Sequence, residues 1–445
     1  MKQYDAIIIG FGKGGKTIAG KMAKLGKRVA IIEKSAQMYG GTCINEGCIP
    51  SKSLITQAEK YNYHDAIINK EDLITKLRNK NYAKLADLQN VDVITATAKF
   101  VDDHHVAICT ENEEEIIFGD LIFVNTGATP VMPPIKGLAT ANKVDTSASL
   151  MKLEELPKTL AIIGGGYIGL EFSSMYARYG SKVTVFEHGE RLVKREDKDI
   201  ADEIQKVLES QGVAFEFLSS VEAFENDGEQ VVVSYKDASG NNHRLTVDGV
   251  LLAAGRHANT KALALDQAGV KVDARGNVIV NEHLQTNVPH IYAMGDVKGG
   301  LQFTYISLDD YRIVKDHLFG EGKRTTENRG NIAYSVFISP TFSRVGLSEQ
   351  EALKAAHNIK IAKMPAAAIP RANVISQPNG LLKAVIDADT EQVLGCVLFC
   401  AESEEMINFV ALAMDQKLPY QAIRDHIFTH PTMSEALNDL FSNVQ

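Results

Sequence analysis

Cys43 and Cys48 lie in the run GGTCINEGCIPSK, residues 40–52, and are two of only five cysteines among 445 residues. A zinc ribbon would need a second pair of this kind, and no other cysteine or histidine is near enough to complete a tetrahedral site. A structural disulfide would be unusual in a chain with no predicted export signal. The spacing therefore predicts a redox-active pair that cycles between dithiol and disulfide during turnover.

The other three cysteines are predicted to be inert, buried small hydrophobic residues. Cys396 and Cys400 flank a predicted strand, so their Cα atoms should be about 13 Å apart, which is beyond the reach of a disulfide. Cys109 stands alone in another predicted strand. Redox chemistry is therefore assigned to Cys43 and Cys48.

The composition is that of a globular protein, and the length suggests about three domains. The formal net charge of −9 argues against a nucleic acid or an anionic membrane as partner, since binding to phosphate groups needs a basic face. Lysines do cluster near the N-terminus, but they are spaced along one predicted helix and are interpreted as its solvated face. They are Lys13, Lys16, Lys21, Lys24 and Lys27.

No signal peptide is predicted at the N-terminus, because the apolar run of residues 4–9 is too short and leads into a lysine-bearing loop. No stretch approaches the ~20 apolar residues that are needed to span a bilayer. We therefore expect a cytoplasmic protein with no membrane partner.

A glycine-rich turn between a strand and a helix occurs twice. The strand of residues 4–9 runs into GFGKGG, a helix should follow to about Leu25, and a second strand ends at Glu33. The same pattern begins again 154 residues later, with the turn GGGYIG and a second strand that ends at Glu187. The equivalent pairs are Gly10 and Gly164, Gly12 and Gly166, Gly15 and Gly169, Gly26 and Gly180, Val29 and Val183, and Glu33 and Glu187.

Each of these units is typical of a dinucleotide-binding site, and the presence of two makes the motif specific. The glycines allow a tight turn and bring the backbone close to a pyrophosphate at a helix N-terminus, while the acidic residue accepts hydrogen bonds from a ribose 2′-hydroxyl. Glu33 and Glu187 would both repel a 2′-phosphate, so each site should prefer an unphosphorylated ribose, as in FAD or NAD(H). Two such sites and a dithiol predict electron flow from nicotinamide to flavin to disulfide.

Later segments extend the α/β arrangement. Residues 120–127 and 249–255 are each predicted to form a buried strand that ends in a glycine turn. Residues 290–296 should form a strand with Asp296 at its C-terminal tip, where α/β folds place ligand contacts. After about Asn331 the strands continue without a glycine motif, which predicts a third domain.

His430 and Glu435 lie in the run FTHPTMSE, residues 428–435. A carboxylate that orients an imidazole is what a thiol-activating base requires, although a lone histidine in such a position is more often a capping or packing residue. A metal pair with His426 is disfavoured, because Pro431 interrupts any helix there. No metal site is predicted.

With these motifs in this order, the sequence resembles the flavin-dependent pyridine nucleotide-disulfide oxidoreductases, such as glutathione reductase, lipoamide dehydrogenase and mercuric reductase. The resemblance covers the whole chain and rests on GGTCxNxGCxPSK, GGGYIGLE, the strand that ends at Asp296, and HPTxSE. It implies an α/β protein with two Rossmann-like domains, for FAD and NAD(P), and a C-terminal α+β dimerisation domain. The implied FAD domain covers residues 1–147 and 263–332, the NAD(P) domain 148–262 and the dimerisation domain 333–445.

The resemblance also implies a role for each motif of the redox centre. Cys48 would face the flavin and form the charge-transfer pair, and Cys43 would be the interchange thiol that meets the substrate. Lys52 would lie by the flavin N5 atom and pair with Glu171. Tyr167 would cover the nicotinamide pocket and swing aside for the cofactor.

His430 would be the acid/base and Glu435 its orienting partner. Both come from the other subunit in this family, which implies an obligate homodimer. The implied FAD contacts are Gly10, Gly12, Gly15, Glu33, Lys34, Gly41, Thr42, Lys52, Thr126, Gly127, Gly295, Asp296, Gln302, Phe303 and Thr304. The implied NAD(P)H contacts, with NADH favoured, are Gly164, Gly166, Tyr167, Ile168, Gly169, Glu187 and Gly255.

Three runs resemble a bacterial subgroup of the family, the reactive-chlorine resistance flavoproteins, which includes hypothiocyanous acid reductases. They are GFGKGGKT, MYGG and QFTYISLDDYR, which begin at residues 10, 38 and 302. QFTY and the run IPRA at residues 369–372 also resemble mercuric reductase, but that enzyme needs a C-terminal cysteine pair, and the last cysteine here is Cys400. Phe428 stands where the lipoamide and glutathione branches usually have a second histidine.

The leading hypothesis is an enzyme in which NAD(P)H, through FAD and the Cys43–Cys48 disulfide, reduces a small oxidised sulfur species such as hypothiocyanous acid, in defence against oxidative stress. Such an oxidant needs only an exposed thiolate of low pKa, which suits Cys43. The alternatives are dihydrolipoamide dehydrogenase, a mercuric or copper ion reductase, and a non-enzymatic redox-sensing flavoprotein. The last is disfavoured, because a sensor needs no proton-handling base.

Overall fold

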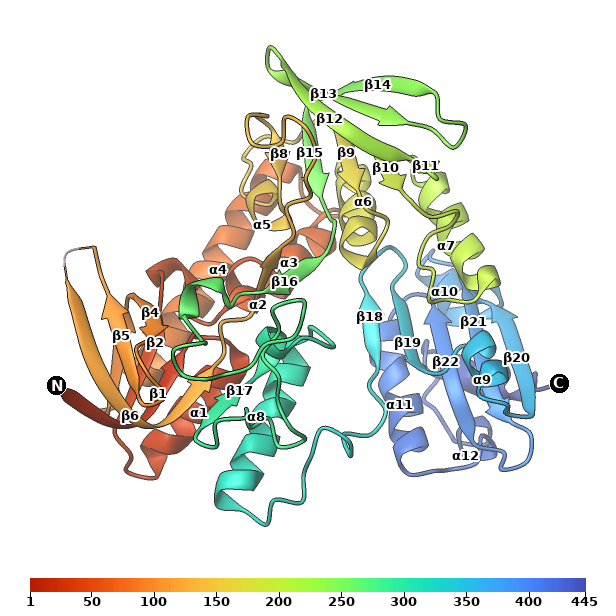
Figure 1. Ribbon diagram of the computed structural model, residues 1–445. Coiled ribbons are helices and arrows are strands. Elements are labelled where there is room, and N and C mark those ends of the chain that lie inside the picture. The colour runs from red at the N-terminus through yellow and green to blue at the C-terminus, as the bar shows by residue number, and fades with distance from the viewer. Residues whose placement is uncertain (112) are drawn as a thin grey trace. The chain divides into compact units, whose positions relative to one another are not determined.

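The computed structural model describes residues 1–111 and 113–445, and within them the chain forms two compact units. Both units contain sheets with helices packed against them (Figure 1). Unit 1 consists of Met1–Leu54, His64–Met132 and Gly255–Arg329, and unit 2 of Ile55–Tyr63, Pro133–Ala254 and Gly330–Gln445. The segments predicted to bind NAD(P) and to dimerise thus fall mostly in unit 2, and the boundary between them remains a prediction.

Unit 1 is built on a seven-stranded sheet with the order β3-β2-β1-β6-β5-β4, in which β17 also pairs with β6. All of its pairings are parallel except those of β4 with β5 and of β5 with β6. The strands are β1 (Lys2–Ile9), β2 (Val29–Glu33), β3 (Val91–Thr95), β4 (Thr97–Phe100), β5 (His105–Cys109), β6 (Glu114–Val124) and β17 (Ile291–Ala293), with a separate pair of β7 (Ala128–Pro130) and β16 (Arg256–Ala258).

The helices of unit 1 connect these strands. They are α1 (Lys13–Lys24), α2 (Thr42–Asn45), α3 (Cys48–Gln57), α4 (Tyr63–Ala86) and α8 (Thr304–Phe319), with the short 3₁₀ turns η1 (Ala36–Met38), η2 (Lys261–Leu263) and η3 (Gly295–Lys298). The α3 and α4 helices also include residues of the Ile55–Tyr63 segment of unit 2.

A continuous apolar run forms β1, and such a run suits a parallel strand that is buried on both faces. Ile7 and Ile9 face one core of unit 1, while Ile8 faces the other. Ile18 of α1 and Ile313 of α8 belong to the second core, so these two helices cover that face of the sheet. The glycine turn after β1 is therefore held at the carboxyl edge of the sheet, at the N-terminus of α1.

Unit 2 contains a second parallel sheet with the order β11-β10-β9-β15-β8. The predicted repeat is confirmed by its register. Ala6 pairs with Val29 in unit 1, and Leu160 pairs with Val183 at the equivalent place in unit 2. The elements are β8 (Val144–Asp145), α5 (Ser147–Leu150), β9 (Thr159–Ile163), α6 (Tyr167–Tyr179), β10 (Lys182–Glu187), α7 (Lys198–Ser210), β11 (Val213–Phe217) and β15 (Gly249–Leu252).

Two antiparallel sheets complete unit 2. A three-stranded sheet of β12 (Ser220–Asp227), β13 (Gln230–Lys236) and β14 (Asn242–Val247) packs its apolar face on the same core as β9 and β15. The C-terminal part holds a five-stranded sheet with the order β18-β19-β22-β21-β20, with α11 beside it (Figure 1).

The elements of this C-terminal part are β18 (Tyr334–Val336), β19 (Phe342–Gly346), α9 (Glu349–Lys354), β20 (Ile359–Pro365), η4 (Ala366–Ala368), α10 (Pro370–Val374), β21 (Leu381–Asp387), β22 (Val393–Phe399), α11 (Ser403–Asp415), α12 (Gln421–Arg424) and α13 (Ala436–Ser442). Cys396 and Cys400 are buried in its core, as predicted. Among the helices that the structure describes, none is both long and apolar enough to cross a bilayer.

Candidate active site

The loop that carries the two cysteines is fixed against the first glycine turn. Cys43 lies in α2 and Cys48 begins α3. Gly41 has a φ of +80°, and a Cβ atom at this position would lie 2.8 Å from the Cα of Gly12, so only glycine permits this approach. The side chain of Asn45 donates to the carbonyl oxygens of Tyr39 (3.1 Å) and Gly41 (2.9 Å), which fixes the turn before Cys43.

The two cysteines are not joined by a disulfide in this structure, and their thiols hydrogen-bond to each other. Cys48 is exposed, and its sulfur lies 3.6 Å from the hydroxyl of Thr304 at the start of α8, whereas Cys43 is half-buried. The hydrogen bond with Cys48 and burial together raise the pKa of Cys43. Cys43 is therefore half-buried and not exposed as expected, because it lies in the α2 turn beside the second thiol. Its role as the reacting thiolate remains a prediction.

The acidic residue of each glycine unit bonds to the turn of the same unit. In unit 1 the Oε2 atom of Glu33 accepts a hydrogen bond from the backbone N–H of Phe11 (3.0 Å). In unit 2 the Oε2 atom of Glu187 accepts the equivalent bond from Gly165 (2.9 Å), and its Oε1 atom accepts from Gly189 (2.7 Å). Burial raises the pKa of Glu33. Both sites therefore hold a carboxylate at the place where the second strand ends.

The other predicted FAD contacts lie at the carboxyl edge of the first sheet and on two helix N-termini. Asp296 is in η3 directly after β17, and burial raises its pKa, while Arg256 and Lys298 oppose this rise. Lys34 follows β2, Gly41 precedes α2, Thr42 begins it and Lys52 is in α3. Thr126 and Gly127 follow β6, Gln302 and Phe303 precede α8, and Thr304 begins it.

Side chains that the sequence did not single out hold this edge together. Asn125 accepts a hydrogen bond from the backbone N–H of Gly15 (2.8 Å) and donates to the carbonyl oxygen of Met294 (2.6 Å), which ties the glycine turn to the end of β17. Asp310, buried in α8, accepts from the backbone N–H of Gly295 (2.7 Å). Both contacts link segments far apart in the sequence, so no local signal could have identified them.

The second glycine turn is equally close-packed. A Cβ atom at Gly169 would lie 2.0 Å from the carbonyl oxygen of Gly164, whereas a Cβ atom at Gly166 would meet no atom within 4 Å. The turn is thus tight on its inner side and open at the N-terminus of α6, where Ile168 lies in the first turn. Gly255, the last predicted NAD(P)H contact, follows this sheet and opens the last segment of unit 1.

Tyr167 belongs to a half-buried polar network. Its hydroxyl lies 3.0 Å from that of Tyr334 and donates to Glu196 (3.2 Å), which also accepts from Tyr334 (2.7 Å). Arg344 neutralises Glu196 at 3.1 Å. Burial and the nearby Glu196 charge raise the pKa of Tyr167 to about 12. The phenol is therefore neutral and anchored, and its predicted outward swing would have to break two hydrogen bonds.

His430 and Glu435 lie within hydrogen-bonding distance, as their spacing suggests. The Nδ1 atom of His430 lies 2.8 Å from the Oε2 atom of Glu435, whose Oε1 atom accepts from the backbone N–H of Thr432 (3.1 Å). The imidazole is 71% exposed, whereas the glutamate side chain is only 20% exposed. A fixed carboxylate thus orients an imidazole that projects outward. Glu171 is buried in α6 and accepts from the backbone N–H of Phe337 (2.8 Å), and its predicted pairing with Lys52 remains a prediction.

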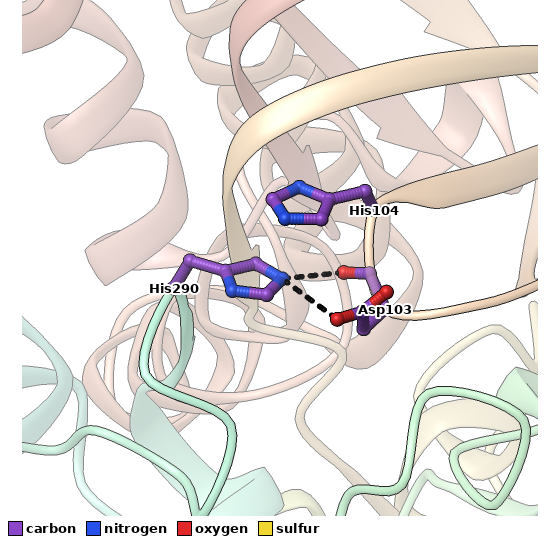
Figure 2. Close-up of side chains that lie close together, drawn as sticks. All are labelled: Asp103, His104 and His290. Atoms are coloured by element: carbon purple, nitrogen blue, oxygen red, sulfur yellow. Dashed lines mark hydrogen bonds and ion pairs between the residues drawn. The ribbon is translucent and has the colours of Figure 1, made fainter.

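One group of side chains in the described residues has the composition of a metal site, namely Asp103, His104 and His290 (Figure 2). The two imidazole rings are stacked, with centroids 3.8 Å apart and planes within 3° of parallel. An imidazole nitrogen binds a metal in the plane of its ring, so two stacked rings cannot both direct a lone pair at one ion. His290 instead lies 2.7 Å from the carbonyl oxygen of Asp103.

Residues 4–310 match the pyridine nucleotide-disulphide oxidoreductase family, and residues 332–441 match its dimerisation domain. The chain belongs to this family. The probable pyridine nucleotide-disulfide oxidoreductase RclA of Escherichia coli K12 is 49% identical over 446 residues, which cover all of both chains. A mercuric reductase of Lysinibacillus sphaericus is 32% identical, over 98% of this chain and 81% of that protein.

A solved structure of the E. coli protein, described as the Cu(II) complex of HOCl-induced flavoprotein disulfide reductase RclA, superposes with a TM-score of 0.97 over 99% of each chain. These similarities confirm the predicted fold, with two Rossmann-like domains and a C-terminal dimerisation domain, and the predicted oxidoreductase class. They also confirm FAD and NAD(P)H as the cofactors. The two glycine turns, each paired with a carboxylate, fit two dinucleotides.

The remaining differences from the sequence-based expectations concern polar residues. Cys109 is only partly buried, because its thiol donates to the exposed Glu114 (3.3 Å) across the β5–β6 pairing. Lys16 does not belong to a solvated lysine face, because its ammonium group turns inward and donates to Asn81 and Gly40. Glu196 and Tyr334, which hold Tyr167, had no recognisable motif.

Proposed function

We propose that the chain is an NADH-dependent flavoprotein disulfide reductase whose acceptor is a small oxidised sulfur species such as hypothiocyanous acid. The observation that carries this proposal is the full-length similarity to RclA at 49% identity, compared with 32% for the mercuric reductase. RclA is described as HOCl-induced, which is consistent with a substrate of the same class of oxidant. Bound FAD would carry two electrons from NADH to the Cys43–Cys48 disulfide.

Cys43 starts the proposed reaction of the reduced enzyme. Its thiolate attacks the sulfur of hypothiocyanous acid, the S–O bond breaks, and hydroxide leaves as water with a proton from His430. Cys43 then carries an S–S–CN group. The Cys48 thiolate attacks the Cys43 sulfur, thiocyanate leaves, and the disulfide closes. In one cycle NADH and hypothiocyanous acid thus give NAD⁺, thiocyanate and water.

The proton-handling pair would come from a second copy of the chain. The match to the dimerisation domain supports a homodimer in which His430 and Glu435 of one copy serve Cys43 of the other. Because Glu435 binds the Nδ1 atom of His430, the Nε2 atom is left for proton transfer to and from the substrate. The outward projection of the imidazole is consistent with a target outside its own segment.

The acceptor can be tested by anaerobic titration of the purified enzyme with NADH, followed by rapid mixing with single acceptors. The panel should contain hypothiocyanous acid, lipoamide, glutathione disulfide, and mercuric and copper ions. We expect the highest kcat/KM for hypothiocyanous acid. Rapid turnover of dihydrolipoamide with NAD⁺, together with negligible reduction of hypothiocyanous acid, would assign the chain to the lipoamide dehydrogenases instead.

Reduction of copper(II) is a second candidate, because RclA has been solved as a Cu(II) complex. A thiolate pair can reduce the ion by single-electron steps, and Cys43 and Cys48 lie within hydrogen-bonding distance of each other. The same panel separates the two functions. A kcat/KM for copper(II) above that for hypothiocyanous acid would make copper the preferred acceptor.

A further inference from the structure

Tyr334, in strand β18, lies beside the tyrosine that is predicted to cover the nicotinamide pocket. Its hydroxyl oxygen is 3.0 Å from that of Tyr167, and the centroids of the two rings are 5.5 Å apart. Tyr334 belongs to the segment that matches the dimerisation domain, whereas Tyr167 begins α6, directly after the second glycine turn. A residue from the C-terminal part of unit 2 therefore contacts the first residue after the turn at which NAD(P)H is expected.

Glu196 is the acceptor that the two phenols share. Its Oε1 atom lies 2.7 Å from the hydroxyl of Tyr334 and 3.2 Å from that of Tyr167. The glutamate side chain is fully buried, and its Oε2 atom pairs with the buried guanidinium of Arg344 (3.1 Å). Because a buried carboxylate needs hydrogen-bond donors from the protein, the bonds that it accepts are costly to break.

Arg344 in turn fixes the position of Glu196. Its Nη1 atom also donates to the carbonyl oxygen of Arg195 (3.0 Å). Its Nη2 atom donates to the carbonyl oxygen of Gly346 (3.2 Å) and pairs with Glu351 of α9. The carboxylate is thus held by β19 and α9, so it cannot follow Tyr167. Any swing of the Tyr167 ring leaves its two hydrogen-bond partners behind.

These contacts favour one position of the half-buried Tyr167 ring over every other. A cofactor that binds only when the ring is released binds with a reduced apparent affinity. The intrinsic affinity is multiplied by the fraction of molecules in which the ring is already released. Stronger bonds to Tyr167 therefore mean a higher apparent Kd for the cofactor.

We propose that Tyr334 and Glu196 are positioning residues that hold Tyr167 in its covering position and thereby set the affinity of the enzyme for NADH. The inference rests on the proposed NADH-dependent function and on the predicted movement of Tyr167. It adds that the C-terminal part of the chain, through Tyr334 and Arg344, controls the step in which the cofactor binds.

The test measures reduction of the FAD-loaded enzyme by NADH in a stopped-flow instrument. The dependence of the rate on NADH concentration separates the Kd for NADH from the limiting rate of flavin reduction. Tyr167→Phe keeps the ring but removes the hydroxyl. Loss of a hydrogen bond to a charged group changes an equilibrium by about tenfold or more, so the Kd should fall by about tenfold. The limiting rate should change little, because the ring that covers the pocket is retained.

Tyr334→Phe leaves Tyr167 with its bond to Glu196, so the Kd should fall by only about threefold. In the double variant, Tyr334→Phe should have no further effect, because the hydroxyl through which Tyr334 acts on Tyr167 is already absent. A general loss of packing would not give this conditional result. Ser335→Ala is the matched control. It removes a hydroxyl from the same strand that bonds to Ser343 (2.8 Å), and it should leave both constants unchanged.

A Kd for NADH that is unchanged or higher in either single variant would overturn the proposal. So would a double variant that binds NADH more tightly than Tyr167→Phe, because Tyr334 would then act by another route. Tyr167→Phe alters a half-buried side chain and remains a test even where Tyr334→Phe does not fold. Failure of hypothiocyanous acid as an acceptor would refute the proposed function but leave the NADH measurements in force, so the two failures are distinguishable.

Discussion

Replacing Glu435 by glutamine is expected to damage the enzyme more than replacing it by alanine. Glu435 accepts two hydrogen bonds, from the Nδ1 atom of His430 and from the backbone N–H of Thr432. A glutamine has one oxygen, and the backbone N–H can only donate, so that oxygen must face Thr432. The amide NH₂ group then faces the Nδ1 atom of His430.

The consequence is a change of tautomer. Nδ1 must now accept a hydrogen bond, so the ring proton moves to Nε2, the nitrogen that should exchange protons with the substrate. A comparable amide substitution in a serine protease triad costs about 10⁴-fold. We therefore expect Glu435→Gln to slow acceptor reduction by about 10²–10⁴-fold, the range also expected for His430→Ala. Glu435→Ala leaves the ring free to choose its tautomer and should cost only about 10–10²-fold.

The assay separates the two half-reactions. Stopped-flow mixing with NADH measures reduction of the enzyme, which all three variants should retain. Mixing of the reduced enzyme with hypothiocyanous acid measures acceptor reduction, where the loss should appear. His426→Ala, which removes an exposed histidine four residues away, is the matched control. A glutamine variant that is as fast as the parent, or faster than the alanine variant, would refute the reasoning.

Three other perturbations have defined outcomes. Cys43→Ser should show a long-wavelength thiolate-to-flavin absorption band without reductant, whereas Cys48→Ser should lack this band even after reduction. If Cys43→Ser lacks the band at neutral pH, the roles assigned to the two thiols are reversed. NADH should have a higher kcat/KM than NADPH, because Glu187 repels a 2′-phosphate, and Glu187→Ala should narrow the difference; a clear NADPH preference in the parent enzyme would contradict this. Lys383→Met should lower the free energy of unfolding, measured by urea titration, by about 3–5 kcal/mol, because it removes the cation of a buried ion pair. Lys363→Met, which removes a half-exposed lysine, should lower it by at most about 1 kcal/mol.

The stability prediction has a defined pH dependence. Lys383 is buried and contacts Asp197 (2.9 Å), Asp199 (3.2 Å) and Glu349 (2.7 Å). Burial alone would raise the pKa of both aspartates, but the hydrogen bonds and lysine charges lower it overall. Because the folded pKa is depressed, this stabilisation is present above the unfolded value of about 3.9 and is lost as pH falls through the folded value. The free energy of unfolding of Lys383→Met should therefore fall less as the pH is lowered than that of the parent chain.

The amino-acid sequence by itself determined the features that depend on neighbouring residues. The two glycine turns, the carboxylates Glu33 and Glu187 and the spacing of His430 and Glu435 all follow from short-range rules. A strand of known length must present its last residue at the sheet edge, and five positions suffice for a glutamate to reach back to a histidine. The fold class and the family could be predicted for the same reason, since these runs occur in a fixed order.

Only the tertiary structure decided which polar groups are buried and how they are paired. Lys16 and Asn81, or Tyr167 and Tyr334, are far apart in the sequence and meet only when helices and strands pack. The helical spacing of the lysines predicted a solvated face, but burial depends on what covers each side chain. Lys16 is covered by Asn81 of α4 and by Gly40, which precedes the two cysteines. Cys43 was expected to be exposed for its chemistry, yet the turn that presents it also withdraws it from solvent. Its ionisation therefore depends on charges that the fold, and not the local sequence, brings to it.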